Sequence, residues 1–222
     1  YSEIMKKTVI VTFDDAVTSQ LTNAVPVLQE YGFGATFYIC RFNDDWRAKH
    51  SQYLLTLAAV KQLHDLGFEI GNHTWSHPDL KQLTVEEIDR EVGSLNDWLA
   101  GGGIPAPVTF AYPGGPYVEK AVPVLKAHHL KAARIVGDAS LDLTTCDPMR
   151  IPSIAVQKDD WDLFLHALSF VAEDRAAVLV FHGTPDIVHP WVDMSAGFFG
   201  RCMAYLKEQD YQVCSLRDYL TI

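Results

Sequence analysis

Short apolar runs alternate with longer amphipathic segments along this 222-residue chain, and the alternation limits the folds that it can adopt. Residues 8–13 (TVIVTF) form a compact β-branched run, which is typical of a strand buried on both faces. Segments with helical spacing follow such runs, and at Thr84 a capping-box pattern with Glu87 marks the start of one helix. This order favours one parallel sheet with helices packed outside it.

The elements expected from these patterns fill the chain without a linker, a repeat or a low-complexity tract. Pro152 restricts one expected strand to an edge or a bulge, so the count is seven or eight. That number suggests an α/β barrel in a single domain over residues 1–222, with an open doubly wound sheet as the alternative. Strands are expected at 8–13, 35–40, 68–71, 108–112, 132–136, 150–156, 178–181 and 212–216, and helices at 19–31, 54–66, 84–99, 118–129, 161–172 and 196–209.

The charge balance argues against nucleic acid as a partner, and the apolar content argues against a membrane-spanning helix. Eighteen basic against twenty-eight acidic side chains leave a formal net charge of −10. Such a surface repels phosphate backbones, so nucleic acid is not an expected partner, whereas a neutral or cationic substrate meets no such penalty. No run approaches the roughly 20 apolar residues that a membrane-spanning helix needs.

The cysteines and the first residues leave the cellular compartment open. The chain begins without Met and shows no signal-peptide pattern, which is what a removed leader or a trimmed sequence would leave. Cys40, Cys146, Cys202 and Cys214 have no metal-binding spacing. Most of them are interpreted as core thiols, although a disulfide between Cys202 and Cys214 is compatible with the even count.

Polar or conformationally special residues follow four of the expected strands directly. The carboxyl ends of parallel strands meet at one edge of a sheet or barrel, so these segments are expected to converge. Any one of them alone has a structural explanation, such as a helix cap or a core histidine, but their joint placement makes coincidence improbable. The segments are Asp14-Asp15, His73 with His77, Pro113-Gly114-Gly115, and His182-Gly183.

The two histidines and the aspartate pair predict a metal site. His73 and His77 are four residues apart, and on a helical turn that spacing projects both imidazoles to one side. Neutral imidazole suits Zn²⁺, with Co²⁺ or Ni²⁺ as alternatives, and a carboxylate commonly supplies the third ligand. One member of the Asp14-Asp15 pair would complete a three-ligand set with an open position, which is typical of a catalytic metal site.

Such a site predicts hydrolysis. A divalent metal lowers the pKa of a coordinated water from about 16 towards ~7, so a nearby base can deprotonate it at neutral pH. The second carboxylate of the pair can act as that base, and His182 is the natural acid for a leaving amine. Gly114 offers a backbone N–H as an oxyanion donor.

Four motifs in this order resemble those of the polysaccharide deacetylases, the NodB-homology enzymes of carbohydrate esterase family 4: TFDD at 12–15, HTWSHP at 73–78, AYPGG at 111–115 and VFHG at 180–183. The resemblance implies a distorted (β/α) barrel and removal of acetyl groups from N-acetylglucosamine polymers, xylan or peptidoglycan. It assigns Asp14 as the base, His182 as the acid, and Asp15, His73 and His77 as the metal ligands. An acetylated carbohydrate is the implied partner, and such polymeric targets favour a secreted or periplasmic protein.

The chain departs from the family pattern at one catalytic position. In many members an arginine two residues before the motif proline orients the base, and here that position is Ala111. Arg150 could supply a guanidinium from a neighbouring strand, which would require its side chain to face Asp14. The family's Asp-Trp motif has only Asp160-Trp161 and Asp138 as candidates, and Trp161 is interpreted as a core residue.

Four further residues are candidates for the substrate cleft. Trp75 and Tyr112 lie inside the motifs and are expected to line the pocket. The loop GTPDIVHPW at 183–191 is rich in turn residues, and loops after barrel strands often carry binding residues. There, Trp191 would stack on a sugar face and His189 would hydrogen-bond to it.

Three other functions compete with that of a deacetylase. A hydrolase of other non-peptide C–N bonds on a similar barrel usually alters the Asp-Asp or histidine motifs, which this chain keeps. A carbohydrate-binding pseudoenzyme that retains the metal would explain the missing arginine, but binding alone needs neither Asp14 nor His182. An iron oxygenase usually presents H-x-D on a jelly roll, whereas this chain has H-x₃-H on an α/β pattern.

Overall fold

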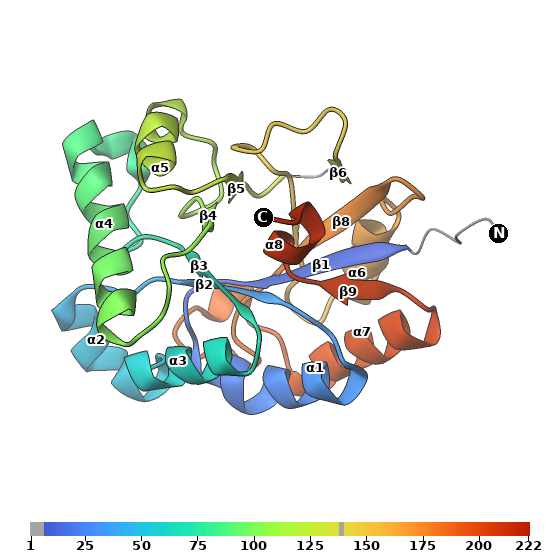
Figure 1. Ribbon diagram of the computed structural model, residues 1–222. Coiled ribbons are helices and arrows are strands. Elements are labelled where there is room, and N and C mark those ends of the chain that lie inside the picture. The colour runs from blue at the N-terminus through green and yellow to red at the C-terminus, as the bar shows by residue number, and fades with distance from the viewer. Residues whose placement is uncertain (1–6, 138–139) are drawn as a thin grey trace.

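Strand β1 (Thr8–Phe13) lies at the centre of a mostly parallel sheet in the computed structural model, which describes residues 7–137 and 140–222 (Figure 1). All six residues of β1 are buried. On one edge, β8 (Arg175–Phe181) pairs with β1 in parallel along most of its length. On the other edge, β9 (Gln212–Cys214) pairs with the first half of β1 and β2 (Thr36–Ile39) with its end.

The sheet curls until its two ends meet. Beyond β2 it continues in parallel through β3 (Glu69–Asn72), β4 (Thr109–Ala111) and β5 (Ala132–Arg134). The segment that leads into β7 (Ile154–Ala155), itself parallel to β8, forms a bridge between Ile151 and Arg134 of β5. The single α/β domain is therefore a distorted barrel, as expected. The ninth strand, the two-residue antiparallel β6 (Leu141–Asp142), was not expected.

Helices cover the outside of the curled sheet, and Figure 1 shows α1, α3 and α7 along one outer face. The capping box predicted at Thr84 is present, because Thr84 and Glu87 bond each other's backbone N–H groups. Two helices, α2 and α8, were not expected. The helices are α1 (Val25–Tyr31), which follows a π-helical turn at Gln20–Ala24, α2 (Asp44–His50), α3 (Leu57–Asp65), α4 (Val85–Gly101), α5 (Val122–Ala127), α6 (Trp161–Leu168), α7 (Ala196–Glu208) and α8 (Leu216–Leu220), with 3₁₀ turns at Ser51–Tyr53, Leu80–Gln82, Glu119–Ala121 and Pro190–Val192.

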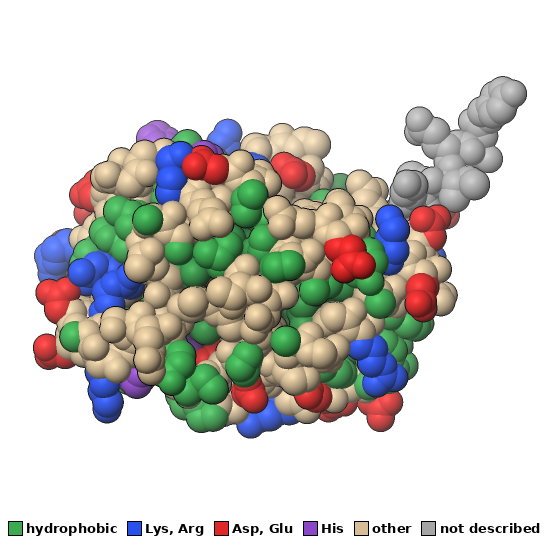
Figure 2. All heavy atoms as spheres, turned by 90° about the horizontal axis from the view of Figure 1, so that it is seen from below, with side chains coloured by type: hydrophobic (Ala, Val, Ile, Leu, Met, Phe, Trp, Pro, Cys, Tyr) green, Lys and Arg blue, Asp and Glu red, His purple; other side chains and the backbone are tan. Residues whose placement is uncertain are grey.

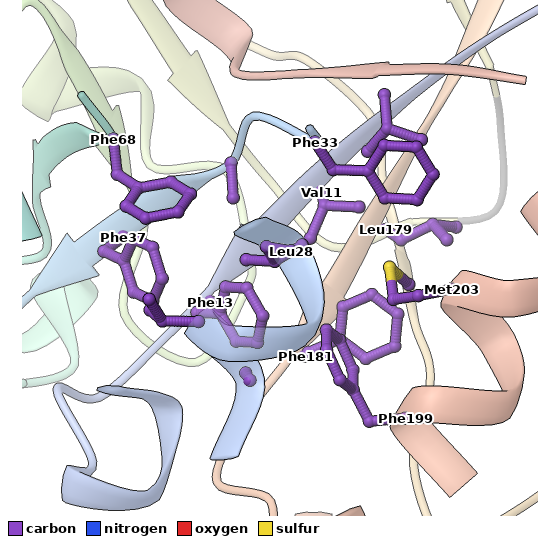
Figure 3. Packing of buried hydrophobic residues seen from close by; sticks show 14 of the residues in the cluster. Val11, Phe13, Leu28, Phe33, Phe37, Phe68, Leu179, Phe181, Phe199 and Met203 are labelled. Carbon is purple, nitrogen blue, oxygen red and sulfur yellow. The ribbon is translucent and has the colours of Figure 1, made fainter. Parts of the chain in front are cut away.

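The main hydrophobic core lies between the sheet and these helices. Figure 3 shows Phe13 of β1 and Phe37 of β2 beside Phe181 of β8 and Phe199 of α7. The rings of Phe13 and Phe37 are stacked, with centroids 4.8 Å apart. Because side chains alternate along a strand, the outward direction of Phe13 leaves the next residue, Asp14, on the inner side.

The interior of the barrel carries a buried carboxylate. Glu69 accepts hydrogen bonds from the hydroxyls of Thr36 and Thr109, both at 2.6 Å, and from the backbone N–H of Arg217 in α8, at 2.8 Å. Burial raises the pKa of Glu69, and these donors offset part of that rise. The carboxylate therefore joins three elements, β2, β4 and α8, because each contributes a donor that would otherwise be buried without a partner.

The surface charges, the lengths of the helices and the cysteines are three further features of the described chain. On the face seen in Figure 2, Lys and Arg side chains lie scattered among acidic and neutral ones and form no continuous basic surface among the described residues. In the described part of the chain, no helix has the length and apolarity needed to cross a bilayer. All four cysteines are free thiols, so the disulfide considered between Cys202 and Cys214 is not formed.

Candidate active site

The aspartate pair lies at a sharp turn directly after β1. Asp15 has a φ of 75° and Ala16 a φ of 53°, a left-handed conformation that is costly for residues other than glycine. Two hydrogen bonds hold this turn. The Gln20 side-chain amide donates to the Asp14 carbonyl at 2.6 Å, and the Leu55 N–H donates to the Ala16 carbonyl at 2.8 Å. The strained turn places both carboxylates, Asp14 and Asp15, at the carboxyl end of the barrel.

The two histidines converge for a different reason from the one predicted. The segment after β3 is not helical, so the helical-turn explanation of the four-residue spacing is wrong. Instead, Thr74 and His77 are left-handed, with φ values of 74° and 57°. The Asn72 side chain accepts from the Thr74 N–H at 2.8 Å, and the Thr74 hydroxyl accepts from the His77 N–H at 3.1 Å. This turn brings the rings of His73 and His77 within 4.9 Å, centroid to centroid.

Asp15 and the two histidines form a cluster that fits a cation. Nε2 of His73 and Nε2 of His77 each lie 3.4 Å from Oδ1 of Asp15. Atoms that share one ion at about 2.0–2.1 Å lie roughly 3–3.5 Å from one another, so the spacing suits a metal of the zinc type. Within the described residues, these three side chains are the group whose ligand atoms lie close enough to hold an ion.

The hydrogen bonding of His73 supports the same interpretation. Its Nδ1 lies 2.7 Å from the Ala111 carbonyl, which can only accept, so Nδ1 carries a hydrogen and the Nε2 lone pair faces Asp15. Nε2 of His73 and Oδ1 of Asp15 are both buried without a hydrogen-bond partner among the described residues. Two buried acceptors that face each other are unfavourable unless a cation or a proton lies between them.

Asp14 is paired with a buried arginine. The guanidinium of Arg134 donates to both carboxylate oxygens of Asp14, at 2.8 and 2.7 Å, and to the hydroxyl of Thr12 at 2.9 Å. It also lies over the ring of Tyr38, 5.0 Å from the centroid. Burial raises the pKa of Asp14, but Arg134 and the nearby histidines outweigh burial and hold that pKa below its usual value. Asp14 is therefore a carboxylate at neutral pH.

Arg134, not Arg150, supplies the guanidinium that contacts Asp14. Arg150 is exposed, and its guanidinium lies over the ring of Tyr117, so the expectation that it faces Asp14 is wrong. Arg134 is the register partner of Ala111 on the neighbouring strand β5, so the guanidinium reaches the base from one strand further along. A signal for this was present: Arg134 is the one charged residue in the apolar strand predicted at 132–136, and a buried arginine requires an anionic partner.

A cleft of about 310 Å³ opens beside this cluster. His182 lines it, with Nε2 3.9 Å from Oδ2 of Asp15, and its Nδ1 has no hydrogen-bond partner among the described residues. Asp186, which the sequence reasoning missed, is buried and accepts from the N–H groups of Gly183 and His189. It also lies 3.1 Å from Nδ1 of His189. The cleft is lined by Asp14, Asp15, His77, Gly114, Gly115, Val136, Ala155, Gln157, His182, His189, Trp191 and Val192.

Gly114, His189 and Trp191 thus lie where the sequence placed them, whereas Tyr112 and Trp75 do not line the cleft. Tyr112 is buried in a second hydrophobic cluster, and its hydroxyl donates to the Met149 carbonyl at 2.8 Å. The positive φ values around His73 turn the Trp75 ring outward, where the guanidinium of Arg41 lies over it at 4.6 Å.

The candidates for the family's Asp-Trp motif have structural roles or cannot be placed. Asp160 caps α6 by accepting from the Leu163 N–H. Trp161 packs against Phe164 in the main core, as interpreted from the sequence. Asp138 lies outside the described residues. In the described chain, neither Asp160 nor Trp161 lines the cleft.

The family model for polysaccharide deacetylases matches residues 2–133, more than half of the chain. The chain belongs to the polysaccharide deacetylase family. Among curated members, a peptidoglycan-N-acetylglucosamine deacetylase of Bacillus cereus is 30% identical over 118 residues, 53% of this chain and 50% of that protein. A chitooligosaccharide deacetylase of Azorhizobium caulinodans is 32% identical over 96 residues, 42% of this chain and 41% of that protein. The matches span from about a fifth to about half the length of the curated relatives.

Solved structures of the polysaccharide deacetylase family share the fold over nearly the whole chain. A family 4 carbohydrate esterase from Streptomyces lividans, in complex with acetate, has a TM-score of 0.64 at 20% identity and covers 94% of this chain and 91% of its own. A pseudoenzyme of the CE4 family from Bacillus anthracis has a TM-score of 0.67 at 19% identity and covers 98% of this chain and 66% of its own. At such identities the likeness establishes the fold alone.

Loss of Arg134 should destabilise this polysaccharide deacetylase fold far more than loss of Arg150. Arg134→Gln would leave Asp14 buried without a cation, which we expect to cost about 3–5 kcal/mol of the free energy of unfolding. Arg150→Gln removes an exposed side chain and should stay within about 0.5 kcal/mol of the parent. Urea unfolding followed by circular dichroism measures both, and equal small losses would show that the Arg134–Asp14 pair contributes little.

Proposed function

We propose that this chain is a metal-dependent hydrolase that removes acetyl groups, N-acetyl in the first instance, from a carbohydrate. The observation that carries the proposal is the Asp15–His73–His77 cluster, in which Asp15 and His73 are buried, next to an ionised Asp14 that lines the same cleft. Membership of the polysaccharide deacetylase family supports the reaction type, as do the printed activities of the bacterial relatives. That residues 1–222 form one such domain remains part of the proposal.

Asp15, His73 and His77 would hold the metal, with Zn²⁺ favoured over Co²⁺ or Ni²⁺ because two imidazoles and one carboxylate form the donor set. When bound there, the ion supplies a Lewis acid that polarises the acetyl carbonyl and makes water acidic enough to react at neutral pH. The Ala111 carbonyl keeps His73 in the tautomer that presents Nε2 to the ion.

Asp14 is the proposed base. Arg134 and the histidines keep its carboxylate charged, and each carboxylate oxygen keeps a second lone pair free after accepting from Arg134. Asp14 can therefore take the proton of the attacking water while the guanidinium holds its orientation fixed. The Asp14 and Arg134 side chains need not move during the proton transfer, because both of their hydrogen bonds exist before substrate binds.

His182 is the proposed acid, and Gly114 the proposed donor to the carbonyl oxygen. His182 lies beside Asp15 and lines the cleft, where it can donate a proton to the leaving amine. Gly114 has a φ of 74°, and its N–H bonds to no other group among the described residues, so the amide is available to a ligand.

A metal-retaining pseudoenzyme is the competing function, because one solved structure with this fold is described as a CE4 family pseudoenzyme. The absence of the family arginine at Ala111 was the main sequence argument for it. Arg134 removes that argument, because a guanidinium does contact Asp14. A hydrolase of other non-peptide C–N bonds would share the metal and the base and would differ in substrate alone.

Acetate release tests the proposal. The protein is stripped of metal, reloaded with zinc or cobalt, and incubated with N-acetylglucosamine oligomers and with acetylated xylan. Metal-dependent acetate from either substrate supports a deacetylase, and the ratio between them begins to define the sugar. Stoichiometric metal binding without acetate would overturn the proposal in favour of another C–N substrate or a binding protein.

Asp14→Asn and His73→Ala should fail in different ways. Asp14→Asn removes the base and should lower kcat by about 10²–10⁴-fold while the protein still binds one metal ion. His73→Ala removes a ligand and should lose the metal itself. Metal content by atomic absorption, together with acetate release, separates the two, and Asp97→Asn on the exposed face of α4 is a matched control. Full activity in Asp14→Asn would show that another group is the base.

His182→Ala should affect substrates according to their leaving groups. An amine must be protonated to leave, whereas the phenolate of an activated acetyl ester leaves without help. We expect a larger loss of kcat/KM on an N-acetylated sugar than on 4-nitrophenyl acetate. Equal losses on the two substrates would remove the acid role from His182.

Metal affinity should rise with pH, because a proton competes with the ion at His73. Burial lowers the pKa of His73, but the carboxylates of Asp14 and Asp15 outweigh burial and raise that pKa above 6.5 in the metal-free protein. Below that pKa the ring is protonated and metal must displace the proton, so affinity should rise by about tenfold per pH unit until the ring is neutral. Calorimetry in buffers of different ionisation heat measures the released proton; a pH-independent affinity would contradict this account.

A further inference from the structure

Tyr38 connects two groups of buried polar side chains inside the barrel. The side chain of Tyr38 is completely buried. Its hydroxyl donates to the Thr109 hydroxyl at 3.1 Å, and Thr109 in turn donates to the carboxylate of Glu69. The guanidinium of Arg134, which contacts Asp14, lies over the ring of the same tyrosine. One side chain therefore links the Glu69 network to the arginine of the proposed base.

The hydroxyl of Tyr38 is fixed by the network around Glu69. As a carboxylate, Glu69 can only accept, so the Thr109 hydroxyl donates its one hydrogen to it, at 2.6 Å, and accepts from Tyr38. The Thr36 hydroxyl accepts from the Leu216 N–H at 3.0 Å and donates to Glu69 in the same way. Glu69 thus sets the direction of these hydrogen bonds, and the Tyr38 hydroxyl has a defined acceptor.

The ring of Tyr38 packs against the backbone of the neighbouring strand. Gly71 on β3 is the register partner of Tyr38 on β2. A Cβ at Gly71 would collide with Cδ1 and Cε1 of the Tyr38 ring, so any other residue at this position would displace the ring. The ring is therefore held at its hydroxyl by Thr109 and along one edge by β3.

The guanidinium of Arg134 is not held by hydrogen bonds alone. Its two Nη atoms donate to the carboxylate of Asp14 and to the hydroxyl of Thr12. Its Nε, by contrast, is buried without a hydrogen-bond partner among the described residues. The Tyr38 ring lies 5.0 Å from Cζ and offers its negative face to the cation. The ring thus supports the part of the guanidinium that no acceptor holds.

We infer that Tyr38 is a positioning residue for the proposed base. Its ring keeps the Arg134 guanidinium where it contacts both oxygens of Asp14, and Thr109 and Glu69 keep the ring in place. This inference rests on the proposed function, because it takes Asp14 as the group that accepts the proton of the attacking water. Tyr38 does not line the cleft in the described chain, and it takes part in no proton transfer.

Turnover tests the inference. The metal-loaded protein is given N-acetylglucosamine tetramer, and acetate release is measured. Tyr38→Leu removes the ring face and should lower kcat by about tenfold, with KM and metal content as in the parent, because a misaligned base slows proton transfer without changing substrate contacts. Tyr38→Phe keeps the ring and should recover most of that loss.

Phe164→Leu is the matched control for Tyr38→Leu. Phe164 is a buried aromatic residue of α6 in the main hydrophobic core. Its replacement should lower the midpoint of urea unfolding as Tyr38→Leu does, but leave the kcat of the folded protein unchanged. Parent kcat in folded Tyr38→Leu would show that the tyrosine only fills space.

The link to Glu69 has its own test, which does not require Tyr38→Leu to fold. Tyr38→Phe and Thr109→Val each remove the hydrogen bond between the ring and the Glu69 network, and each should lower kcat by about twofold to threefold. The double variant should lose no more than either single variant, because both changes remove one interaction. Losses that multiply in the double variant would contradict the link.

Arginine NMR separates this inference from the proposed function, because it needs no turnover. In metal-free protein labelled with ¹⁵N-arginine, the Arg134 signal is assigned by its absence from Arg134→Lys. Rotation of the guanidinium about its Nε–Cζ bond should be about fivefold faster in Tyr38→Leu than in the parent, and unchanged in Phe164→Leu.

The two measurements can fail independently. Faster rotation in Tyr38→Leu, together with a parent protein that releases no acetate, would support the positioning of Arg134 by Tyr38 and overturn the deacetylase. Acetate release with the same kcat and the same rotation rate in the parent and in Tyr38→Leu would support the deacetylase and overturn the role of Tyr38.

Discussion

Two adjacent carboxylates, Asp14 and Asp15, are buried at the end of the central strand, and the rest of the site depends on how their charges are balanced. Burying a carboxylate costs several kcal/mol unless a cation or several donors compensate it. Asp14 has its cation in Arg134, which contacts both of its oxygens. Asp15 instead faces two imidazoles: burial raises the pKa of its carboxyl, but the adjacent histidines outweigh burial and hold that pKa well below its usual value. One carboxylate is thus paired with an arginine of the chain, and the other belongs to the cluster that could hold an ion.

This division of charge depends on the closure of the barrel. In the order of the sheet, β5 is separated from β1 by three strands, so Arg134 reaches Asp14 across the interior and not along the sheet. The bridge between Arg134 and Ile151 brings the two ends of the sheet together, and Tyr38 lies beneath the guanidinium. An open sheet would leave that arginine far from Asp14. The orientation of the Asp14 carboxylate and its low pKa therefore both depend on the curl of the sheet.

The sequence predicted those features that depend on local pattern. Strand periodicity and the rule that polar groups gather at carboxyl ends located Asp14, Asp15, His73, His77 and His182 at one end of the barrel. Features that depend on backbone turns or on pairing between distant strands could not be predicted from local sequence pattern. The register of β4 against β5 decides that Arg134 substitutes for the residue absent at Ala111, and no local pattern encodes that register. The left-handed Thr74 and His77 likewise belong to a turn that no helical or strand pattern predicts, and Trp75 within that turn does not line the cleft.

The exchange between Ala111 and Arg134 bears on how a missing motif residue should be interpreted. The effect of an arginine on Asp14 depends on the position of its guanidinium group. Because the side chain is long, an arginine on either of two neighbouring strands can place its guanidinium there. A motif position on β4 records only which residue that strand carries. It therefore indicates that the arginine is missing, although a guanidinium does contact Asp14. For a site of this kind, the physical criterion for a competent base is whether a buried cation contacts its carboxylate. By that criterion the departure at Ala111 is compensated, and the motif alone gives no reason to regard the chain as inactive.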